Sequence, residues 1–189
     1  MGFEKIDIEL GKKGKIEVNE KFQTSHPNIF AVGDVIGFPG LAATASAQGR
    51  LAAAHAFGIA DDVLNLPLPF GIYSIPEISY VGQNEQELTE QNIPYETGIA
   101  RFREIVRGQI LGDEEGMLKV LFHRETLDIL GVHIIGEYAT ELIHIGQAAM
   151  ALKGGLHYLR DAVFNYPTLA ECYKVAAFDG YNKIRISNS

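Results

Sequence analysis

The sequence predicts an α+β fold, and two observations carry that prediction. Two alternating apolar segments, Met117–His123 and Ile129–Ile135, are joined by a short polar connection, which is typical of an antiparallel hairpin. Helical periodicity takes over at Ala139, and a last helix is expected over residues 169–182. Strands followed by helices that pack on one face describe an α+β domain.

A different pattern precedes this domain and reads as the tail of an α/β domain. Residues 15–18 and 28–32 are expected to be short strands, and the second one ends at Gly33-Asp34. The alanine-rich stretch from 41 to 57 favours a helix. Residues 61–70 carry two prolines and no clear period, so we expect a linker and two parts, 1–65 and 66–189.

The remaining elements of the second part follow from local signals. A strand is expected within 76–82 and another over 95–102, and Asn84 with Glu87 predicts a capped helix running to about residue 91. Apolar residues that should share a strand face are Leu118, Val120 and Phe122 in one strand and Leu130, Val132 and Ile134 in the other. The expected apolar stripe of the helix from Ala139 is Leu142, Ile145, Ala149 and Leu152, ending before Gly154.

Composition excludes several classes of function. The chain has 189 residues, and 16 Lys+Arg against 24 Asp+Glu give a net charge of −8, which argues against a nucleic-acid partner. No apolar run is long enough for a transmembrane helix, so no membrane partner is expected. The single cysteine, Cys172, excludes an internal disulfide framework and reads as a core residue in a cytoplasmic protein. The six histidines show no ligand spacing, so no metal site is expected.

The segment around Asp34 carries the first chemical signal. A carboxylate at the end of a buried strand is suited to accept hydrogen bonds from sugar-like hydroxyls, and Gly33 beside it lets a ligand approach the backbone. The helix that follows offers free N–H groups and the positive end of its dipole. The alternative is an ordinary strand–turn–helix in which Asp34 is a solvated turn residue.

This segment resembles a known motif. Thr24, then Ala31-Val32-Gly33-Asp34, a glycine loop and the run from Ala45 to Ala53 are similar to the second FAD-contact motif of the pyridine nucleotide-disulphide oxidoreductases. The resemblance implies FAD as cofactor, with Asp34 on a ribityl hydroxyl and Gly33 beside it. It also implies that backbone N–H groups at Leu41 and Ala42 reach the pyrimidine edge of the flavin.

A second segment, Tyr73 to Gly82, is similar to the opening of the dimerisation domain of the same family. The hairpin and the helices after it match that domain in order and length. The resemblance therefore implies a homodimer. We expect the hairpin and the last helix to form a two-fold interface that brings each Tyr166 near the flavin position of the partner.

A third segment, Phe164 to Glu171, bears on the reaction. Disulfide reductases of the family carry His-Pro-Thr-x-x-Glu here, but this chain has Tyr166 where they have the histidine. A phenol, with an ordinary pKa of roughly 10, is a poor proton shuttle for thiol chemistry near neutral pH. Glu171 is expected to complete a capping box with Thr168, a catalytic role being the alternative, so no catalytic residue is assigned.

The substitution at Tyr166 favours hydride exchange between nucleotides. The resemblance then implies transfer from NADPH to NAD⁺ through the flavin, which needs no acid for a thiol leaving group. Two alternatives stay open: a disulfide reductase like dihydrolipoamide dehydrogenase, and a dimerisation module without catalysis. The chain contains no GxGxxG, so we expect the nucleotide-binding fingerprints upstream and no activity from this chain alone.

Overall fold

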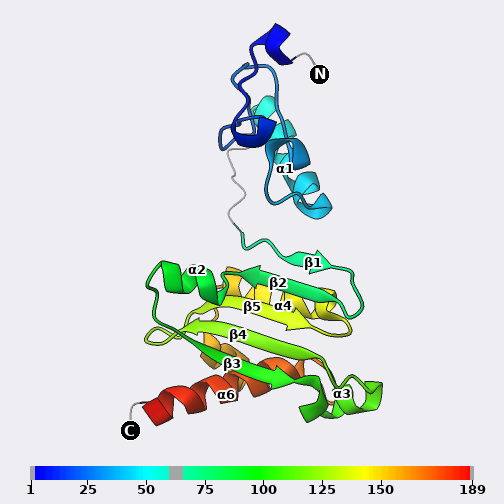
Figure 1. Ribbon diagram of the computed structural model, residues 1–189, viewed down its shortest axis with the longest axis vertical. Helices are drawn as coiled ribbons and strands as arrows, with labels where there is room; N and C mark the ends of the chain where they lie inside the picture. Colours follow the sequence, from blue (N-terminus) through cyan, green and yellow to red (C-terminus); the bar gives the residue numbers. More distant parts are fainter. Residues whose placement is uncertain (1–2, 60–65, 188–189) are drawn as a thin grey trace. The chain divides into compact units, whose positions relative to one another are not determined.

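The computed structural model describes residues 3–59 and 66–187, and the chain divides into two compact units, Met1–Leu66 and Pro67–Ser189 (Figure 1). Among its described residues, the first unit contains three 3₁₀ turns and one helix: η1 Phe3–Ile6, η2 Lys12–Gly14, η3 Gly33–Ile36 and α1 Ala42–Ala56. The strands of the second unit are β1 Phe70–Ile72, β2 Ile78–Gly82, β3 Tyr95–Arg101, β4 Met117–His123 and β5 Ile129–Ile135. Its helices are α2 Glu85–Glu90, η4 Phe102–Glu104, α3 Val106–Leu111, α4 Ala139–Ala151, α5 Leu156–Asp161 and α6 Glu171–Ser187.

The first unit departs from the sequence prediction in its strands. The prediction of strands at 15–18 and 28–32 is wrong, because these segments form only the single bridges Leu10–Ile16 and Gln23–Phe30. A strand needs a neighbour that pairs along its length, and within the described part of this unit each segment forms a β-bridge at one position only. The alanine-rich helix is confirmed as α1, and Leu51 and Ala52 on it pack against Phe22.

The second unit is built on a five-stranded antiparallel sheet. Its strand order is β1-β2-β5-β4-β3, so the predicted hairpin β4–β5 is confirmed and forms the centre. Helices α4 and α6 pack on one face of the sheet (Figure 1). The paired residues Val81, Val132 and Val120 form a fully buried row on that side.

The predicted strand faces are correct except near the turn of the hairpin. A register shift places Phe122 opposite Ile129, so Ile129 is buried while Leu130 is only half-buried. Such a bulge adds one residue to one strand and reverses the alternation beyond it. Strand β1 was missed, since its first residue, Phe70, lay at the end of the expected linker; residues 60–65 of that linker lie outside the described part of the chain.

Helix α4 is rotated relative to its predicted stripe. The side that faces the core consists of Ala139, Ile143, Gly146 and Ala149. By contrast, Leu142 and Ile145 are half-buried, and Leu152 lies beyond the helix with 83% of its surface exposed. The reason is close packing at Gly146, where a Cβ atom would lie 2.8 Å from Cγ2 of Val132. Because small residues face the sheet, the larger ones are left at the rim of the helix.

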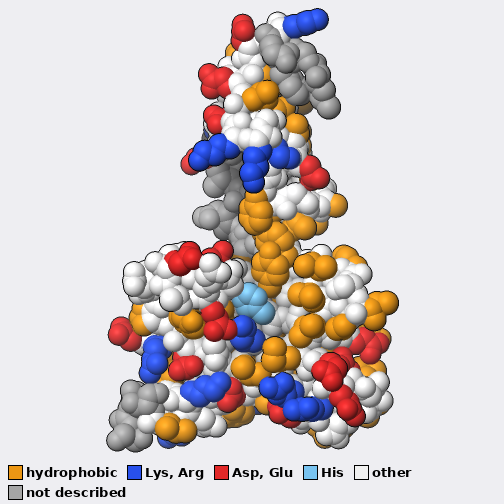
Figure 2. All heavy atoms as spheres, in the orientation of Figure 1, with side chains coloured by type: hydrophobic (Ala, Val, Ile, Leu, Met, Phe, Trp, Pro, Cys, Tyr) orange, Lys and Arg blue, Asp and Glu red, His pale blue; other side chains and the backbone are white. Residues whose placement is uncertain are grey.

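The other face of the sheet carries aromatic side chains. The ring of Tyr80 stacks on Phe70 at 4.6 Å and on His133 at 5.8 Å. Figure 2 shows hydrophobic side chains gathered over β1 and β2 on this face. These cross-strand contacts help to fix the register of β1, β2 and β5 at this end of the sheet.

Candidate functional site

The loop that carries Asp34 is held by its backbone and leaves its carboxylate exposed. Nζ of Lys15 donates to the carbonyl oxygen of Asp34 at 2.6 Å, and the N–H of Gly37 donates to the same oxygen at 3.2 Å. The 3₁₀ turn η3 thus fixes the direction of the residue. Within the described part of the chain, no group donates a hydrogen bond to the Asp34 carboxylate, so its oxygens are available to a ligand.

Gly33 sets the position of this loop against α1. Its φ of +73° lies in the region that favours glycine, and a Cβ atom there would be 3.1 Å from that of Ala45. Its N–H donates to Oε1 of Gln48 at 2.7 Å, and Gln48 is buried. Gln48 was not assigned a role from sequence, although a polar side chain in an alanine-rich helix was an available signal.

The N-terminus of α1 lies beside Asp34 and has no side-chain cap. Leu41 occupies the cap position in an extended conformation, and the first turn contains no acidic residue. A Cβ atom at Gly40 would lie 3.6 Å from Oδ1 of Asp34, which brings the carboxylate next to the start of the helix. The N–H of Ala42 is among the helix donors that have no intrahelical acceptor.

This arrangement suits a ligand with hydroxyls at one part and an electronegative edge at another. The carboxylate of Asp34 can accept hydrogen bonds from the hydroxyls, and the N-terminus of α1 stabilises partial negative charge. Gly40 keeps the space between them clear. These residues therefore fit the ribityl chain and pyrimidine edge of FAD, the cofactor that the sequence led us to expect.

The second candidate segment, Phe164 to Glu171, lies in the second unit. Tyr166 is 67% exposed. The capping box expected from Thr168 and Glu171 is wrong: the hydroxyl of Thr168 donates to the carbonyl of Asn165 at 2.6 Å, and α6 begins only at Glu171. A tight turn over residues 168–171 precedes the helix, so the two side chains are not at the positions that a capping box needs. Oε2 of Glu171 is buried and has no hydrogen-bond partner among the residues that the structure describes.

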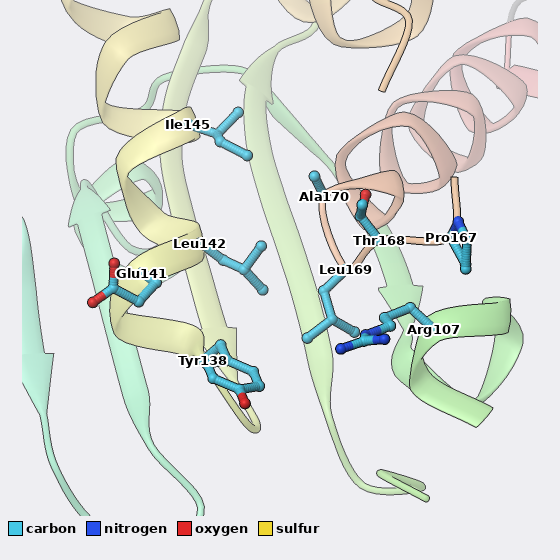
Figure 3. Close-up of a pocket in the computed structure, with 9 residues that line it drawn as sticks. All are labelled: Arg107, Tyr138, Glu141, Leu142, Ile145, Pro167, Thr168, Leu169 and Ala170. Atoms are coloured by element: carbon cyan, nitrogen blue, oxygen red, sulfur yellow. The ribbon is translucent and has the colours of Figure 1, made fainter. Parts of the chain in front are cut away.

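A groove of about 520 Å³ runs between α4 and the start of α6. In Figure 3 the side chains of Leu142 and Leu169 point toward each other across it, and the guanidinium of Arg107 points in from α3. The carboxylate of Glu141 points away from it. The groove is lined by Arg107, Tyr138, Glu141, Leu142, Ile145 and residues 167–170. It therefore combines an apolar floor with charged groups at the rim.

Two residues that sequence reasoning missed position the helices around this groove. The hydroxyl of Tyr173 donates to the carbonyl of Leu142 at 2.8 Å and accepts from the N–H of Gly146 at 3.0 Å, which ties α6 to α4. Burial raises the pKa of this phenol. Glu77 accepts from the N–H and the hydroxyl of Thr140 at 3.1 and 2.7 Å, so it caps α4 from a distant loop. A cap so far away in sequence leaves no local signal.

The cysteine, the potential metal ligands and the helices were each compared with the expectations from the sequence. Cys172 is fully buried, as expected for a core residue, and burial raises the pKa of its thiol to about 12. Among the residues that the structure describes, no cluster of three His, Cys, Asp or Glu side chains could hold a metal ion. No helix in the described ranges is long and apolar enough to cross a membrane.

The fold and these motifs define the class of protein. Residues 68–177 match the family model described as "Pyridine nucleotide-disulphide oxidoreductase, dimerisation domain", and residues 1–49 match the model "Pyridine nucleotide-disulphide oxidoreductase". The chain therefore belongs to the pyridine nucleotide-disulphide oxidoreductase family, which confirms the predicted resemblance and fold class.

Within this family, two curated relatives from bacteria are highly similar in sequence to this chain. The chain is 59% identical over 181 residues to the soluble pyridine nucleotide transhydrogenase of Mycobacterium bovis (strain BCG / Pasteur 1173P2), covering 96% of this chain and 39% of the relative. It is 51% identical over 187 residues to the enzyme of that name from Pseudomonas putida (strain W619), covering 97% and 40%. The chain thus spans about two fifths of the length of these curated relatives.

Solved structures agree with the fold. LpdA from Mycobacterium tuberculosis superposes with a TM-score of 0.84 at 26% identity, covering 94% of this chain and 39% of that one. RclA from Escherichia coli, described as an HOCl-induced flavoprotein disulfide reductase, gives a TM-score of 0.83 at 23% identity, covering 92% and 40%. Because RclA shares only 23% sequence identity with this chain, its similarity concerns the fold alone.

Proposed function

We propose that this chain is part of an FAD-dependent flavoenzyme that transfers hydride from NADPH to NAD⁺. In this proposal residues 1–65 complete the FAD-binding domain and residues 66–189 form the dimerisation domain of a cytoplasmic enzyme. The observation that carries the proposal is the exposed carboxylate of Asp34 next to the uncapped start of α1. The identity of 59% to a transhydrogenase supports the choice of reaction.

The residues of this chain bind and orient the cofactor in the proposed enzyme. When bound, FAD supplies a two-electron carrier for hydride exchange between the two nucleotides. Asp34 holds the ribityl chain, and Gly33 keeps the backbone close to it. The backbone N–H groups at Leu41 and Ala42 hold the pyrimidine edge and stabilise negative charge there.

Tyr166 supports hydride exchange over disulfide reduction. A dithiol substrate requires an acid that protonates a leaving thiolate near neutral pH, and an imidazole does this far better than a phenol. The exposed side chain of Tyr166 has no hydrogen bond within the described part of the chain that would turn it into such an acid. Hydride exchange needs no such group.

We also propose that the enzyme is a homodimer and that the groove between α4 and α6 lies in its interface. The match of residues 68–177 to a dimerisation domain supports this, as do the half-buried side chains of Leu142 and Ile145 at the groove. A two-fold axis would pack the same surface of both copies together.

FAD retention tests the cofactor site. In the complete flavoprotein, Asp34→Ala should weaken FAD binding by roughly 10- to 100-fold, the effect of losing hydrogen bonds to a charged acceptor. Flavin absorbance after gel filtration measures it. Glu20→Ala removes an exposed carboxylate from the same unit and should retain FAD. Equal FAD content in the wild type and Asp34→Ala would contradict the proposed site.

Sedimentation tests the interface. Ile145→Glu places a charge in the groove and should weaken the dimer roughly tenfold or more. Leu152→Glu adds the same charge at an exposed position just beyond the same helix, outside the groove, and should leave the dimer intact. A wild-type monomer at micromolar concentration would contradict the proposed dimer.

A further inference from the structure

Strand β3 is an edge of the sheet. It pairs with β4 on one side only, so alternate backbone groups of β3 face away from the sheet (Figure 1). An open edge of this kind is a template for pairing with another chain. With seven residues, β3 is long enough to pair with a strand of another chain.

From Thr97 to Arg101, the outward N–H groups of β3 are nevertheless occupied by carboxylates. Three consecutive outward donors each bond to one side-chain oxygen: Thr97 to Oε1 of Glu96 at 2.9 Å, Ile99 to Oδ2 of Asp179 at 2.9 Å, and Arg101 to Oε2 of Glu104 at 3.1 Å. Hydrogen bonds to charged acceptors are stronger than those between neutral groups. An incoming strand would have to displace them.

A pair of side chains from α6 holds the middle of the edge. Nζ of Lys183 donates to the carbonyl oxygen of Thr97 at 3.0 Å and to Oδ2 of Asp179 at 2.7 Å. Asp179 and Lys183 therefore occupy one outward donor and one outward acceptor of β3 at once. These two residues are called the latch below.

Close packing of α6 on β3 brings the latch within reach. A Cβ atom at Gly98 would lie 2.1 Å from the carbonyl oxygen of Ala176, and one at Gly180 would lie 3.6 Å from Cα of Gly98. The two glycines thus face each other where helix and strand meet. Because the backbones approach so closely, the short side chain of Asp179, next to Gly180, reaches the N–H of Ile99.

We propose that the latch closes the edge of β3 against pairing with the β3 strand of a second copy of this chain. The β3 strand of a second copy offers the same outward backbone donors and acceptors, which suits two-fold antiparallel pairing. Antiparallel pairing centred on Gly98 sets Thr97 opposite Ile99, and both point their backbone groups outward. The two copies would exchange the N–H···O bonds that the latch now occupies. This inference does not depend on the proposed function.

Space for such a partner lies beside the latch. A groove of about 500 Å³ runs between β3 and α6 and includes Ile99, Phe178 and the latch itself. Its wall contains apolar as well as charged side chains. Once the carboxylate of Asp179 is removed, an added strand would therefore find both the N–H of Ile99 and an apolar surface.

Asp179→Ala in the complete chain is the test. At a concentration low enough to keep the variant unassociated, the amide of Ile99 should then exchange with deuterium faster, on the order of tenfold, because it loses its acceptor. The amide of Ala100, which faces β4, should keep its protection and so report that the sheet is intact. The variant should also gain a concentration-dependent association step, beyond that of the wild type, in sedimentation velocity. Adding Thr97→Pro, which removes an outward donor, should abolish that step.

Control variants separate the latch from a change of charge. Asp179→Asn keeps an oxygen acceptor for Ile99 and should associate like the wild type. Glu125→Ala removes an exposed carboxylate from the turn between β4 and β5 and should do the same. The proposal is overturned if Asp179→Ala leaves the exchange of Ile99 unchanged. It is equally overturned if that exchange accelerates without any new association.

Discussion

The N–H of Gly33 donates to Oε1 of Gln48 across 2.7 Å and so joins the Asp34 loop to helix α1. Gln48 is buried, and Gly33 sits against Ala45 with a positive φ. The bond therefore fixes the position of the Asp34 loop relative to the start of α1, the two parts of the candidate FAD site. A site that binds a rigid cofactor benefits from such a fixed arrangement, because less ordering is needed on binding.

Loss of the Gln48 side chain should destabilise the contact between the Asp34 loop and α1. Gln48→Ala leaves the buried N–H of Gly33 without an acceptor, which costs about 1–3 kcal/mol. Urea denaturation of the chain should show a lower free energy of unfolding by that amount. Arg50→Ala changes an exposed residue of the same helix and should have little effect. Equal stability of the Gln48 variant and the wild type would show that the bond does not hold the loop.

The cap on α4 should be measurable in the same way. Glu77→Ala removes the acceptor of both hydrogen bonds from Thr140 and should lower the free energy of unfolding by about 1–2 kcal/mol. Glu77→Gln keeps an oxygen acceptor and should recover part of that loss. Thermal unfolding followed by circular dichroism compares the two. If alanine and glutamine behave alike and match the wild type, Glu77 is not a cap.

The thiol of Cys172 should be nearly inert in the folded chain. Burial raises its pKa from 9.0 to about 12, so the reactive thiolate should be about a thousandfold scarcer near neutral pH than in an unshifted thiol. Labelling with a maleimide should be slow in buffer and complete in denaturant. Rapid labelling of the native protein would mean that α6 opens readily or that the burial is wrong.

His133 should make the second unit sensitive to acid. Burial is the largest cause that lowers its pKa below 6.5; Lys119 acts in the same direction, and the hydrogen bond to Gln83 opposes it. The unfolded chain thus binds a proton more readily than the folded one, so stability should fall as the pH drops below 6.5.

Urea denaturation at about pH 7.5 and about pH 5.5 checks this prediction. His133→Gln should lose less stability between the two values than the wild type does. The same change at the exposed His157 should leave the wild-type dependence in place. A variant at position 133 that follows the wild type at both values would contradict the assignment.

The sequence predicted the elements whose signals are local. The capping box at Asn84 and Glu87 is present with both hydrogen bonds, and the alternating hairpin β4–β5 pairs as expected. These two predictions are confirmed because each depends on residues that lie a few positions apart in the sequence. In the candidate site, the sequence led to Asp34 through a motif and through the chemistry of a carboxylate before a helix.

Features set by distant contacts were not predictable. The stripe of α4 was misplaced because Gly146 packs on Val132, which a helical period does not reveal. The capping box at Thr168 failed because its hydroxyl bonds to Asn165 in a tight turn. Glu77 and Tyr173 act on residues 27 to 63 positions away, so no short pattern identifies them. Gln48 stands out as a polar residue in an alanine-rich helix, but its partner Gly33 lies 15 positions away and is not revealed by a short pattern.

Reduction of thio-NAD⁺ by NADPH, followed by absorbance, tests the central claim most directly. The complete FAD-loaded protein should catalyse it, and Tyr166→Phe should retain most of the rate because the phenol is not required as an acid. The chain of 189 residues alone should show none. An FAD-loaded enzyme that reduces a disulfide substrate but transfers no hydride from NADPH to thio-NAD⁺ would contradict the account.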